Sequence, residues 1–283
     1  WAWSRIYIKA NGSMKCWCHK GETHTIIHKD LSTVDFVTDI VNSKEAREMR
    51  LSIIRDNRYY IEQCNGCCCL QKQDEPEDKR YSDSPVDNSI THKATQAFRE
   101  MQRVSKLRSW PIGSIDKINE LQLEPSFPCN LKCPGCLQGW HPDPLSTEQP
   151  PFVLPLEWFQ RIVDSSQNHA VRLERIVFVG RGEPTLNKQL PQMINYAKAN
   201  IPQLVMGMDT NSTQPFKPEY LHLTWINCSI DGSTEEAYNT YRHGGNFNTA
   251  INFMRHAVEA KRSLGGRSKI RWKYILFSTT SNK

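Results

Sequence analysis

Apolar residues recur along this chain with two alternating periods. From about residue 118 onward, short apolar runs of strand length alternate with longer stretches that have the spacing of an amphipathic helix. The strand-like runs are 119–126, 174–179, 204–209, 224–230 and 269–277, and the helix-like stretches are 155–168, 187–200, 233–241 and 247–263. Ser233, followed three residues later by Glu236, is a capping-box signal for the third helix. This alternation predicts an α/β fold with a parallel sheet. The number of predicted strands and helices favours a partial (β/α)6-type barrel of about five strands.

The start of the chain has a different pattern, that of a small α+β module. Residues 11–18 indicate a turn into a short strand. Helical stretches are expected at 33–41 and 44–57, and Ser43 is the expected N-cap of the second.

Composition divides the chain into three parts. Residues 1–71 form the amino-terminal module and hold six of the ten cysteines. Residues 72–92 are charged, contain proline and are poor in apolar residues, which is typical of a linker. A basic amphipathic helix is expected at 93–109, so 72–117 is a polar linker with a helix. We expect the barrel to take up 118–283 and to be truncated at its carboxyl end.

Overall composition favours a soluble protein with a core. Hydrophobic residues make up 38% of the chain, yet no run reaches the length of about 18 that a membrane span needs, and no signal-peptide pattern is present. Ten cysteines without secretory features indicate a reducing cytoplasm and a metal or redox use. The net charge of +6 is spread out, as solvated surface charge is. Because the chain starts at Trp1 without an initiator methionine and stops at Lys283, we expect it to be part of a longer product.

Three cysteines follow the first predicted strand of the barrel on one short loop. Cys129, Cys133 and Cys136 have the spacing C-x3-C-x2-C. A structural zinc site takes four protein ligands, whereas a three-ligand site leaves a position open for chemistry. An iron–sulfur cube held by three cysteines likewise leaves one iron free. The loop therefore predicts a metal centre with an open position, and a zinc site or three buried thiols are the alternatives.

The next three predicted strands also end in polar motifs. These are Gly180–Pro184, Asp209–Ser212 and Cys228–Gly232, and Tyr241–Phe247 follows the last of them. In parallel barrels the carboxyl ends of the strands carry the chemistry, so the motifs should converge on the cysteine loop. Taken singly, Glu183 could be an exposed turn residue, Asn211 a helix cap and Arg242 part of a surface salt bridge. Their order along successive strand ends is the stronger signal.

In this order, the motifs of residues 118–283 resemble those of the radical S-adenosylmethionine (radical SAM) superfamily. The resemblance implies that Cys129, Cys133 and Cys136 hold a [4Fe-4S] cluster whose free iron chelates the amino and carboxylate groups of SAM. An electron from the cluster would break the sulfur–C5′ bond, and the resulting 5′-deoxyadenosyl radical would abstract hydrogen from a substrate. No residue is assigned to the later chemistry.

The resemblance also implies which residues surround SAM. They are Gly182, Glu183 and Pro184 at the amino group, Asn211 at the ribose or sulfonium, Ser229 and Asp231 at the boundary of the site, and Arg242 at the carboxylate. A carboxylate suits an ammonium group, and a guanidinium binds a carboxylate bidentately. The chain departs from the family pattern at Arg181, where a second glycine is common, at Gly135, where an aromatic residue is common, and in lacking a sixth strand.

The amino-terminal cysteines resemble a SPASM or twitch module, which carries auxiliary iron–sulfur clusters in radical SAM enzymes. Residues 42–47 match the module's Asn-Ser-x-Glu-x-Arg pattern. The expected ligands of an auxiliary cluster are Cys16, Cys18, Cys64 and Cys67. Two close cysteine pairs also suit tetrahedral zinc, so a zinc ribbon is the alternative. The family carries this module after the barrel, whereas here it comes first.

The same resemblance implies partners. A reducing protein such as flavodoxin or ferredoxin would supply electrons, and a peptide or protein is the expected substrate, because SPASM relatives often modify peptides. We expect neither a membrane nor a nucleic acid as a partner.

Two other functions were weighed. A zinc- or cluster-stabilised nucleic-acid-binding protein would contact phosphates through Lys93, Arg99, Arg103, Lys106 and Arg108. Against it, these basic residues lack interleaved aromatic residues apart from Phe98 and Trp110, and the barrel would have no task. An electron-transfer scaffold would keep its clusters but would never consume SAM.

Overall fold

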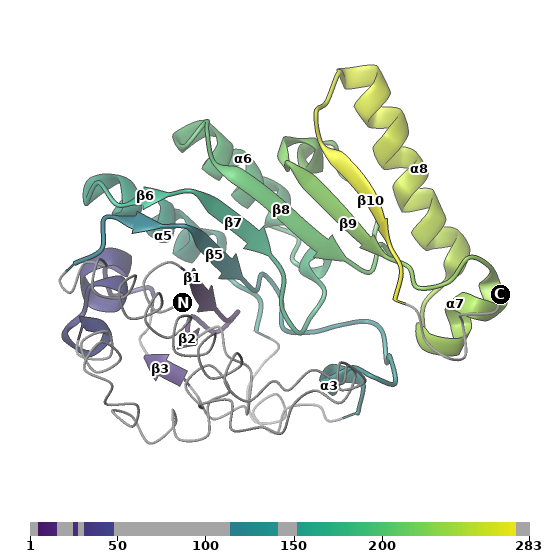
Figure 1. Cartoon of the computed structure of the whole chain (residues 1–283), viewed down its shortest axis with the longest axis horizontal. Coiled ribbons are helices and arrows are strands. Elements are labelled where there is room, and N and C mark those ends of the chain that lie inside the picture. Colours follow the sequence, from purple (N-terminus) through teal and green to yellow (C-terminus); the bar gives the residue numbers. More distant parts are fainter. Residues whose placement is uncertain (1–4, 16–24, 28–30, 48–113, 141–151, 276–283) are drawn as a thin grey trace, which may run out of the picture.

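The computed structural model describes residues 5–15, 25–27, 31–47, 114–140 and 152–275. Within them, one sheet has the spatial order β10-β9-β8-β7-β5-β1-β2-β3 (Figure 1). Its barrel strands are β5 (Glu120–Leu123), β7 (Arg175–Phe178), β8 (Val205–Thr210), β9 (Trp225–Ser229) and β10 (Lys269–Lys273). Neighbouring barrel strands are parallel. The five strands lie where the sequence predicts them, and the α/β class with a mostly parallel sheet is confirmed.

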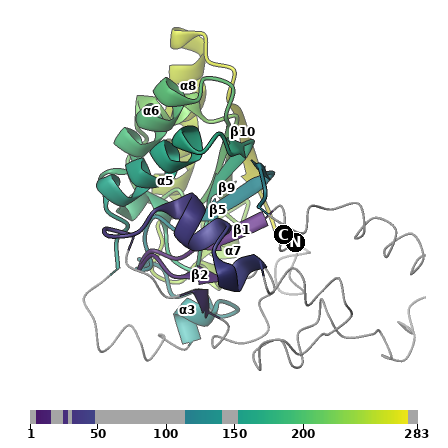
Figure 2. The ribbon, with the colours of Figure 1, turned by 90° about the vertical axis from the view of Figure 1, so that its left-hand side faces the viewer.

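Three long helices cover one face of this sheet (Figures 1 and 2). They are α5 (Leu156–Asn168), α6 (Leu190–Asn200) and α8 (Phe247–Leu264). The shorter helices α3 (Leu137–Trp140) and α7 (Glu235–Tyr241) lie beyond the carboxyl ends of the strands. Smaller elements are the parallel pair β4 (Lys117–Ile118) and β6 (Arg172–Leu173) and the 3-10 helices η4 (Pro184–Leu186) and η5 (Pro218–His222). The predicted barrel helices are thus all present.

The alternation of side chains along the strands places the core between sheet and helices. In β7, Ile176 and Phe178 are fully buried, whereas Arg175 and Val177 between them are partly exposed. The ring of Phe178 lies 6.0 Å from that of Phe159 on α5. Burial of each such apolar side chain contributes about 1.5–3 kcal/mol, so this face holds the barrel together.

The opposite face of the sheet is polar. Arg175 donates a hydrogen bond of 3.0 Å to Glu120 on the neighbouring strand, and its guanidinium lies 5.8 Å from the ring centre of Trp225. Further toward the carboxyl ends, Asp209 accepts hydrogen bonds from Asn227 and Lys273 at 2.6 and 2.9 Å. This face therefore offers charged groups at the end of the barrel where the loops gather.

The amino-terminal residues extend the same sheet. β1 (Arg5–Ile8) pairs in parallel with β5, with Ile6 opposite Leu121. β2 (Met14–Lys15) and β3 (Thr25–Ile27) continue the sheet in antiparallel fashion (Figure 1). Ile6 and Ile8 belong to the same hydrophobic core as the barrel strands. In the described part of the chain, β1, β2 and β3 thus belong to the same sheet as the barrel strands.

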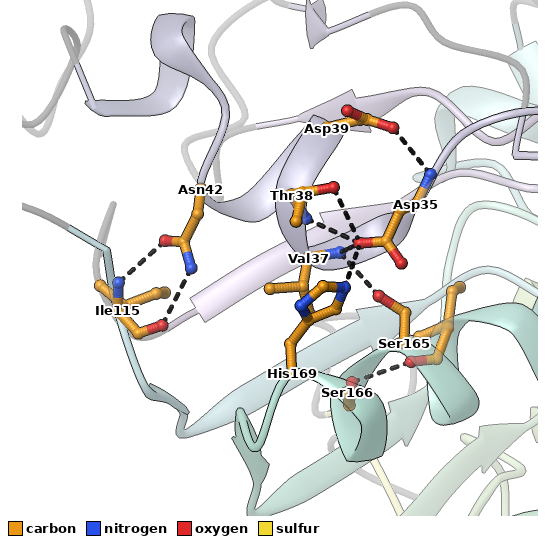
Figure 3. Close-up of polar contacts among 10 residues, drawn as sticks. Asp35, Val37, Thr38, Asp39, Asn42, Ile115, Ser165, Ser166 and His169 are labelled. Atoms are coloured by element: carbon orange, nitrogen blue, oxygen red, sulfur yellow. Dashed lines mark hydrogen bonds and ion pairs between the residues drawn. The ribbon is translucent and has the colours of Figure 1, made fainter.

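A π-helix, η1 (Phe36–Val41), fastens this region to helix α5 (Figure 3). The backbone N–H of Val37 donates to the hydroxyl of Ser165 at 2.9 Å, and His169 Nε2 lies 3.2 Å from the carboxylate of Asp35. At the other end of η1, the side-chain amide of Asn42 both donates to and accepts from the backbone of Ile115. These contacts join residues far apart in the sequence.

Helix starts differ from the predictions in two places. The N-cap of α7 is Thr234, whose hydroxyl accepts from Ala237 N at 3.2 Å, so the cap expected at Ser233 is wrong by one residue. The helix expected over 33–41 begins only at Phe36, because Asp35 caps it. Ser43, by contrast, caps the turn at 44–47 as predicted and accepts from Ala46 N at 3.1 Å.

Several expectations concern residues outside the described ranges. They include the domain boundary at 71, most of the linker 72–117 and the rest of the helix expected at 44–57, which all stay predictions. Among the described helices, none is long and apolar enough to cross a membrane.

Candidate functional site

The cysteine loop follows β5 directly and is held by backbone hydrogen bonds. Cys136 N donates to Cys133 O at 3.0 Å, and Lys132 N donates to His243 O at 2.9 Å. The second bond brings the segment after α7 against the loop, so the first and last of the predicted motifs meet. Helix α3 begins immediately after Cys136.

The three thiols of this loop lie in one electrostatic environment. Cys133 is buried, and Cys129 and Cys136 are half-buried. Burial raises the pKa of Cys129, and negative charge on the other two thiols raises it further. Burial likewise raises the pKa of Cys133, although the nearby Arg242 lowers it. Three thiolates held this way need a positive centre to remain ionised together.

The donor set of this loop consists of thiols, which fits an iron–sulfur cluster. Among the described residues, no three His, Cys, Asp or Glu side chains are close enough together to hold one metal ion. In a [4Fe-4S] cluster each thiolate binds a separate iron, so the sulfur atoms need not converge on one point. All three donors are thiols, the ligand type that iron–sulfur clusters take.

Asn211, at the end of β8, reaches across to the cysteine loop. Its side-chain amide donates to Asn130 Oδ1 at 2.9 Å and lies 3.9 Å from the sulfur of Cys129. Asn130 in turn donates to Thr213 Oγ1 at 2.8 Å. The predicted SAM-site residue Asn211 is therefore beside the expected cluster, with its amide group fixed in orientation.

Glu183 is buried and its carboxylate is heavily hydrogen-bonded. Oε1 accepts from Thr185 N at 3.0 Å, from Thr185 Oγ1 at 2.5 Å and from Thr210 Oγ1 at 2.6 Å, and Oε2 accepts from Asn211 N at 2.6 Å. Burial raises the pKa of Glu183, and these hydrogen bonds lower it. The carboxylate thus joins the end of β7 to the end of β8. Oε2 accepts one of these hydrogen bonds, and a carboxylate oxygen has two lone pairs with which to accept.

Gly182 and Pro184 place this segment against the cysteine loop. A Cβ on Gly182 would overlap the backbone carbonyls of Ser126 and Phe127, so only glycine fits there. Glu183 N donates to Pro128 O at 3.0 Å. Pro184 is buried at the start of η4. Gly182 thus lets this segment approach the backbone just before the cysteine loop closely.

Asp231 and Arg242 form an ion pair beside Cys133. Asp231 is fully buried with a left-handed backbone (φ 52°), and its Oδ1 accepts from Ile275 N at 2.7 Å. Arg242 NH1 lies 3.7 Å from the sulfur of Cys133. Its Nε–H is buried and has no hydrogen-bond partner. A buried donor of this kind is suited to a ligand carboxylate, because leaving it unpaired costs free energy.

Ser229 and Cys228 point to opposite faces at the end of β9. Ser229 is half-buried on the polar face and lies opposite Lys273 on β10. Cys228 is fully buried on the helix face, and burial raises its pKa to about 11. Cys228 is therefore a core residue, whereas Ser229 lies on the polar face of the sheet.

Two residues near the site were not anticipated from the sequence. A Cβ on Gly135 would lie 3.1 Å from the hydroxyl of Tyr241, so Tyr241 flanks the position where the family often has an aromatic residue. The second is Glu124, a buried carboxylate directly after β5. Strand alternation from Glu120 would have placed Glu124 on the polar face, which is the signal that could have found it.

The expected auxiliary-cluster ligands Cys16, Cys18, Cys64 and Cys67 lie outside the described residues. The same holds for the basic residues of the linker helix. Both assignments stay predictions.

Comparisons with known proteins show the family of this chain. The family model described as "Radical SAM superfamily" matches residues 123–267, just over half of the 283-residue chain. A stretch of 145 residues is 26% identical to mycofactocin maturase MftC of Mycobacterium ulcerans (strain Agy99) and covers 50% of this chain and 36% of that protein. The chain thus spans about a third of the length of this curated relative.

Two solved structures are similar to part of this chain. TYW1 with a lysine–pyruvate adduct is 18% identical, with a TM-score of 0.35 over 53% of this chain and 54% of that chain. BtrN in complex with AdoMet and 2-DOIA is 16% identical, with a TM-score of 0.35 over 54% of this chain and 56% of that chain. Each overlap covers about half of either chain.

Proposed function

Because this chain belongs to the radical SAM superfamily, whose enzymes use a [4Fe-4S] cluster and SAM, we propose that it cleaves SAM reductively and starts radical chemistry by hydrogen abstraction. The observation that supports this most directly is the thiol-only loop at the carboxyl end of β5, with Arg242 beside one of its sulfurs. Cys129, Cys133 and Cys136 would hold the cluster. When bound, the cluster supplies the electron that splits SAM into methionine and the 5′-deoxyadenosyl radical.

The chain's own residues would bind and orient SAM. Arg242 has a buried, unpartnered Nε–H and a guanidinium already aligned by Asp231, so it would receive the SAM carboxylate. The remaining acceptor capacity of Glu183 Oε2 and the Gly182 and Pro184 backbone suit the ammonium group. Asn211 would lie at the ribose or sulfonium.

Ser229 would close the site from the polar face of β9, while Asp231 would act through Arg242. Both oxygens of Asp231 are engaged, one by Arg242 and one by the backbone of Ile275. Holding groups in place before the reaction is the protein's main contribution when a cofactor carries the chemistry.

The substrate we propose is a peptide or protein. The relative that matches this chain bears the name of a maturase, a kind of enzyme that converts a precursor into its finished form. A small electron-transfer protein such as flavodoxin or ferredoxin would reduce the cluster in the cytoplasm. We also propose an auxiliary iron–sulfur cluster, with Cys16, Cys18, Cys64 and Cys67 as its ligands.

Anaerobic reconstitution tests this function. The wild-type chain should take up iron and sulfide and, when reduced, convert SAM to 5′-deoxyadenosine. Replacing Cys129, Cys133 and Cys136 together by alanine should abolish cleavage, whereas Cys228→Ala, which removes a thiol from the core, should leave the cluster bound. Cleavage that survives the triple replacement would rule the function out. If the auxiliary cluster exists, the triple variant should keep about four irons per chain.

A further inference from the structure

A buried carboxylate on the polar face takes no part in the proposed SAM contacts. Glu124 directly follows β5, and its side chain is almost completely buried. Leu121 and Leu123 on the same strand belong to the core beneath the helices, so alternation turns Glu124 to the other face. Its backbone N–H donates to Ile8 O at 2.9 Å, which continues the pairing with β1.

The carboxylate of Glu124 joins three segments of the chain. Oε1 accepts from Arg181 N at 2.7 Å and from the hydroxyl of Tyr7 at 3.3 Å, and Oε2 accepts from Ala10 N at 3.3 Å. A Cβ on Gly180 would lie 2.5 Å from Glu124 Cγ, so the loop after β7 passes tightly over this side chain. Strand β1, the start of the cysteine loop and the loop after β7 therefore meet at one carboxylate.

Burial and the neighbouring donors act on the pKa of Glu124 in opposite directions, and burial is the larger effect. Burial raises the pKa of Glu124, while the N–H groups of Arg181 and Ala10 and the nearby Lys9, itself buried, lower it. Burial also raises the pKa of Tyr7, as does the negative charge of Glu124, so the Tyr7 hydroxyl stays a donor. A buried polar network of this kind fixes one arrangement of its members.

We propose that Glu124 is a positioning residue that ties strand β1 to the loop 180–183 and so sets the place of this loop on the cysteine loop. The two residues after Arg181 are the ones that pack there: Gly182 lies against the Ser126 and Phe127 carbonyls, and Glu183 N donates to Pro128 O. A shift of Arg181 would therefore pass to the expected SAM contacts. This inference rests on the proposed function for its effect on SAM. On this proposal, residues 5–10 help to hold the loop 180–183 in place.

Three variants of the full chain test whether Glu124 holds strand β1 and the loop 180–183 together. Glu124→Gln keeps the shape of the side chain, but its NH2 group cannot accept, so either Arg181 N or Ala10 N loses its acceptor. Tyr7→Phe removes one hydrogen bond to Glu124 and keeps the ring. Glu120→Gln is the matched control, because Glu120 is a buried carboxylate on the same strand and face but pairs with Arg175, away from the loop.

Two quantities are measured for each variant. The first is the affinity of the reconstituted chain for SAM, compared at equal iron content. The second is the rate of hydrogen exchange at the Arg181 amide. Glu124→Gln should raise the dissociation constant for SAM about tenfold, and Tyr7→Phe about threefold, because each loses a buried hydrogen bond. Exchange at Arg181 should quicken in both variants but not in Glu120→Gln. The effects of Glu124→Gln and Tyr7→Phe should not add, since both act through one network.

The inference would be overturned if the Arg181 amide exchanged at the same rate in the wild type, in Glu124→Gln and in Tyr7→Phe. This holds whatever the affinity of the variants for SAM. If Glu124→Gln does not fold, Tyr7→Phe decides in the same way. A wild-type chain that holds its cluster but binds no SAM would overturn the proposed function instead, and the tie itself would then be judged by exchange at Arg181 alone.

Discussion

The carboxylate of Glu183 accepts a hydrogen bond of 2.6 Å from the backbone N–H of Asn211, the residue that follows β8. Both residues are predicted SAM contacts, and in the structure they also contact each other. Thr210 adds a second bond of 2.6 Å to the same carboxylate. The ends of two neighbouring strands are therefore held together by the chain's own hydrogen bonds, which favours a preorganised site.

Thr210→Val should weaken this fastening. The change keeps the β-branched shape but removes the donor to Glu183 and the acceptor for Ser212 N. A buried carboxylate that loses a donor should lower the free energy of unfolding by about 1–3 kcal/mol, as measured by denaturant titration. The control is Thr240→Val on the exposed side of α7, which should change the free energy of unfolding by no more than about 0.5 kcal/mol. Equal effects of the two changes would show that the Thr210 bond adds nothing.

Gly182→Ala should disturb cluster assembly. The new methyl group would overlap the carbonyls of Ser126 and Phe127, and the backbone just before the cysteine loop would have to move. We expect a clear loss of iron per chain after anaerobic reconstitution. Gly266→Ala is the control, because a Cβ there meets only ordinary contacts at 3.6 Å from Leu221. Full iron content in Gly182→Ala would contradict the expected coupling of this segment to the loop.

Arg242→Met should destabilise the chain by about 3–5 kcal/mol, because it leaves the fully buried Asp231 carboxylate without its ion-pair partner. The double variant with Asp231→Asn should recover much of this loss, since no unpaired charge remains. Arg255→Met, on the exposed side of α8, serves as the control. If Arg242→Met were no worse than the double variant, the Asp231 charge would not be the cause.

Asp35→Asn should remove a pH-dependent part of the stability. Burial alone would raise the pKa of Asp35, but hydrogen bonds from Thr38 and Ser165 and the proximity of His169 together lower it. A carboxyl with a lowered folded-state pKa stabilises the fold above its unfolded pKa, and this contribution is lost as the pH falls through the folded value. The wild type should therefore exceed Asp35→Asn in unfolding free energy at neutral pH. The difference should vanish in acid, and a constant difference across the titration would contradict this account.

The sequence by itself determined the order and kind of the barrel elements and the place of the cysteine loop. Apolar periodicity is a local property, and buried strands such as 175–178 and amphipathic helices such as 247–264 show it without reference to the rest of the fold. The cysteine spacing and the glycine and acidic residues at strand ends are equally local. Helix starts were less certain, because Ser233 and Thr234 are both good caps and only the backbone geometry chose Thr234.

Only the tertiary structure decided which polar groups form hydrogen bonds with one another. The parallel pairing of β1 with β5 joins Tyr7 to Gln122 across more than a hundred residues, and no local pattern specifies which strands become neighbours. For the same reason, the sequence showed Glu183 at a strand end but not its partner Thr210 on β8. Glu124 was not anticipated, and its partner Tyr7 comes from the start of the chain. Hydrogen bonds depend on atoms within about 3 Å, and that proximity exists only once the sheet has formed.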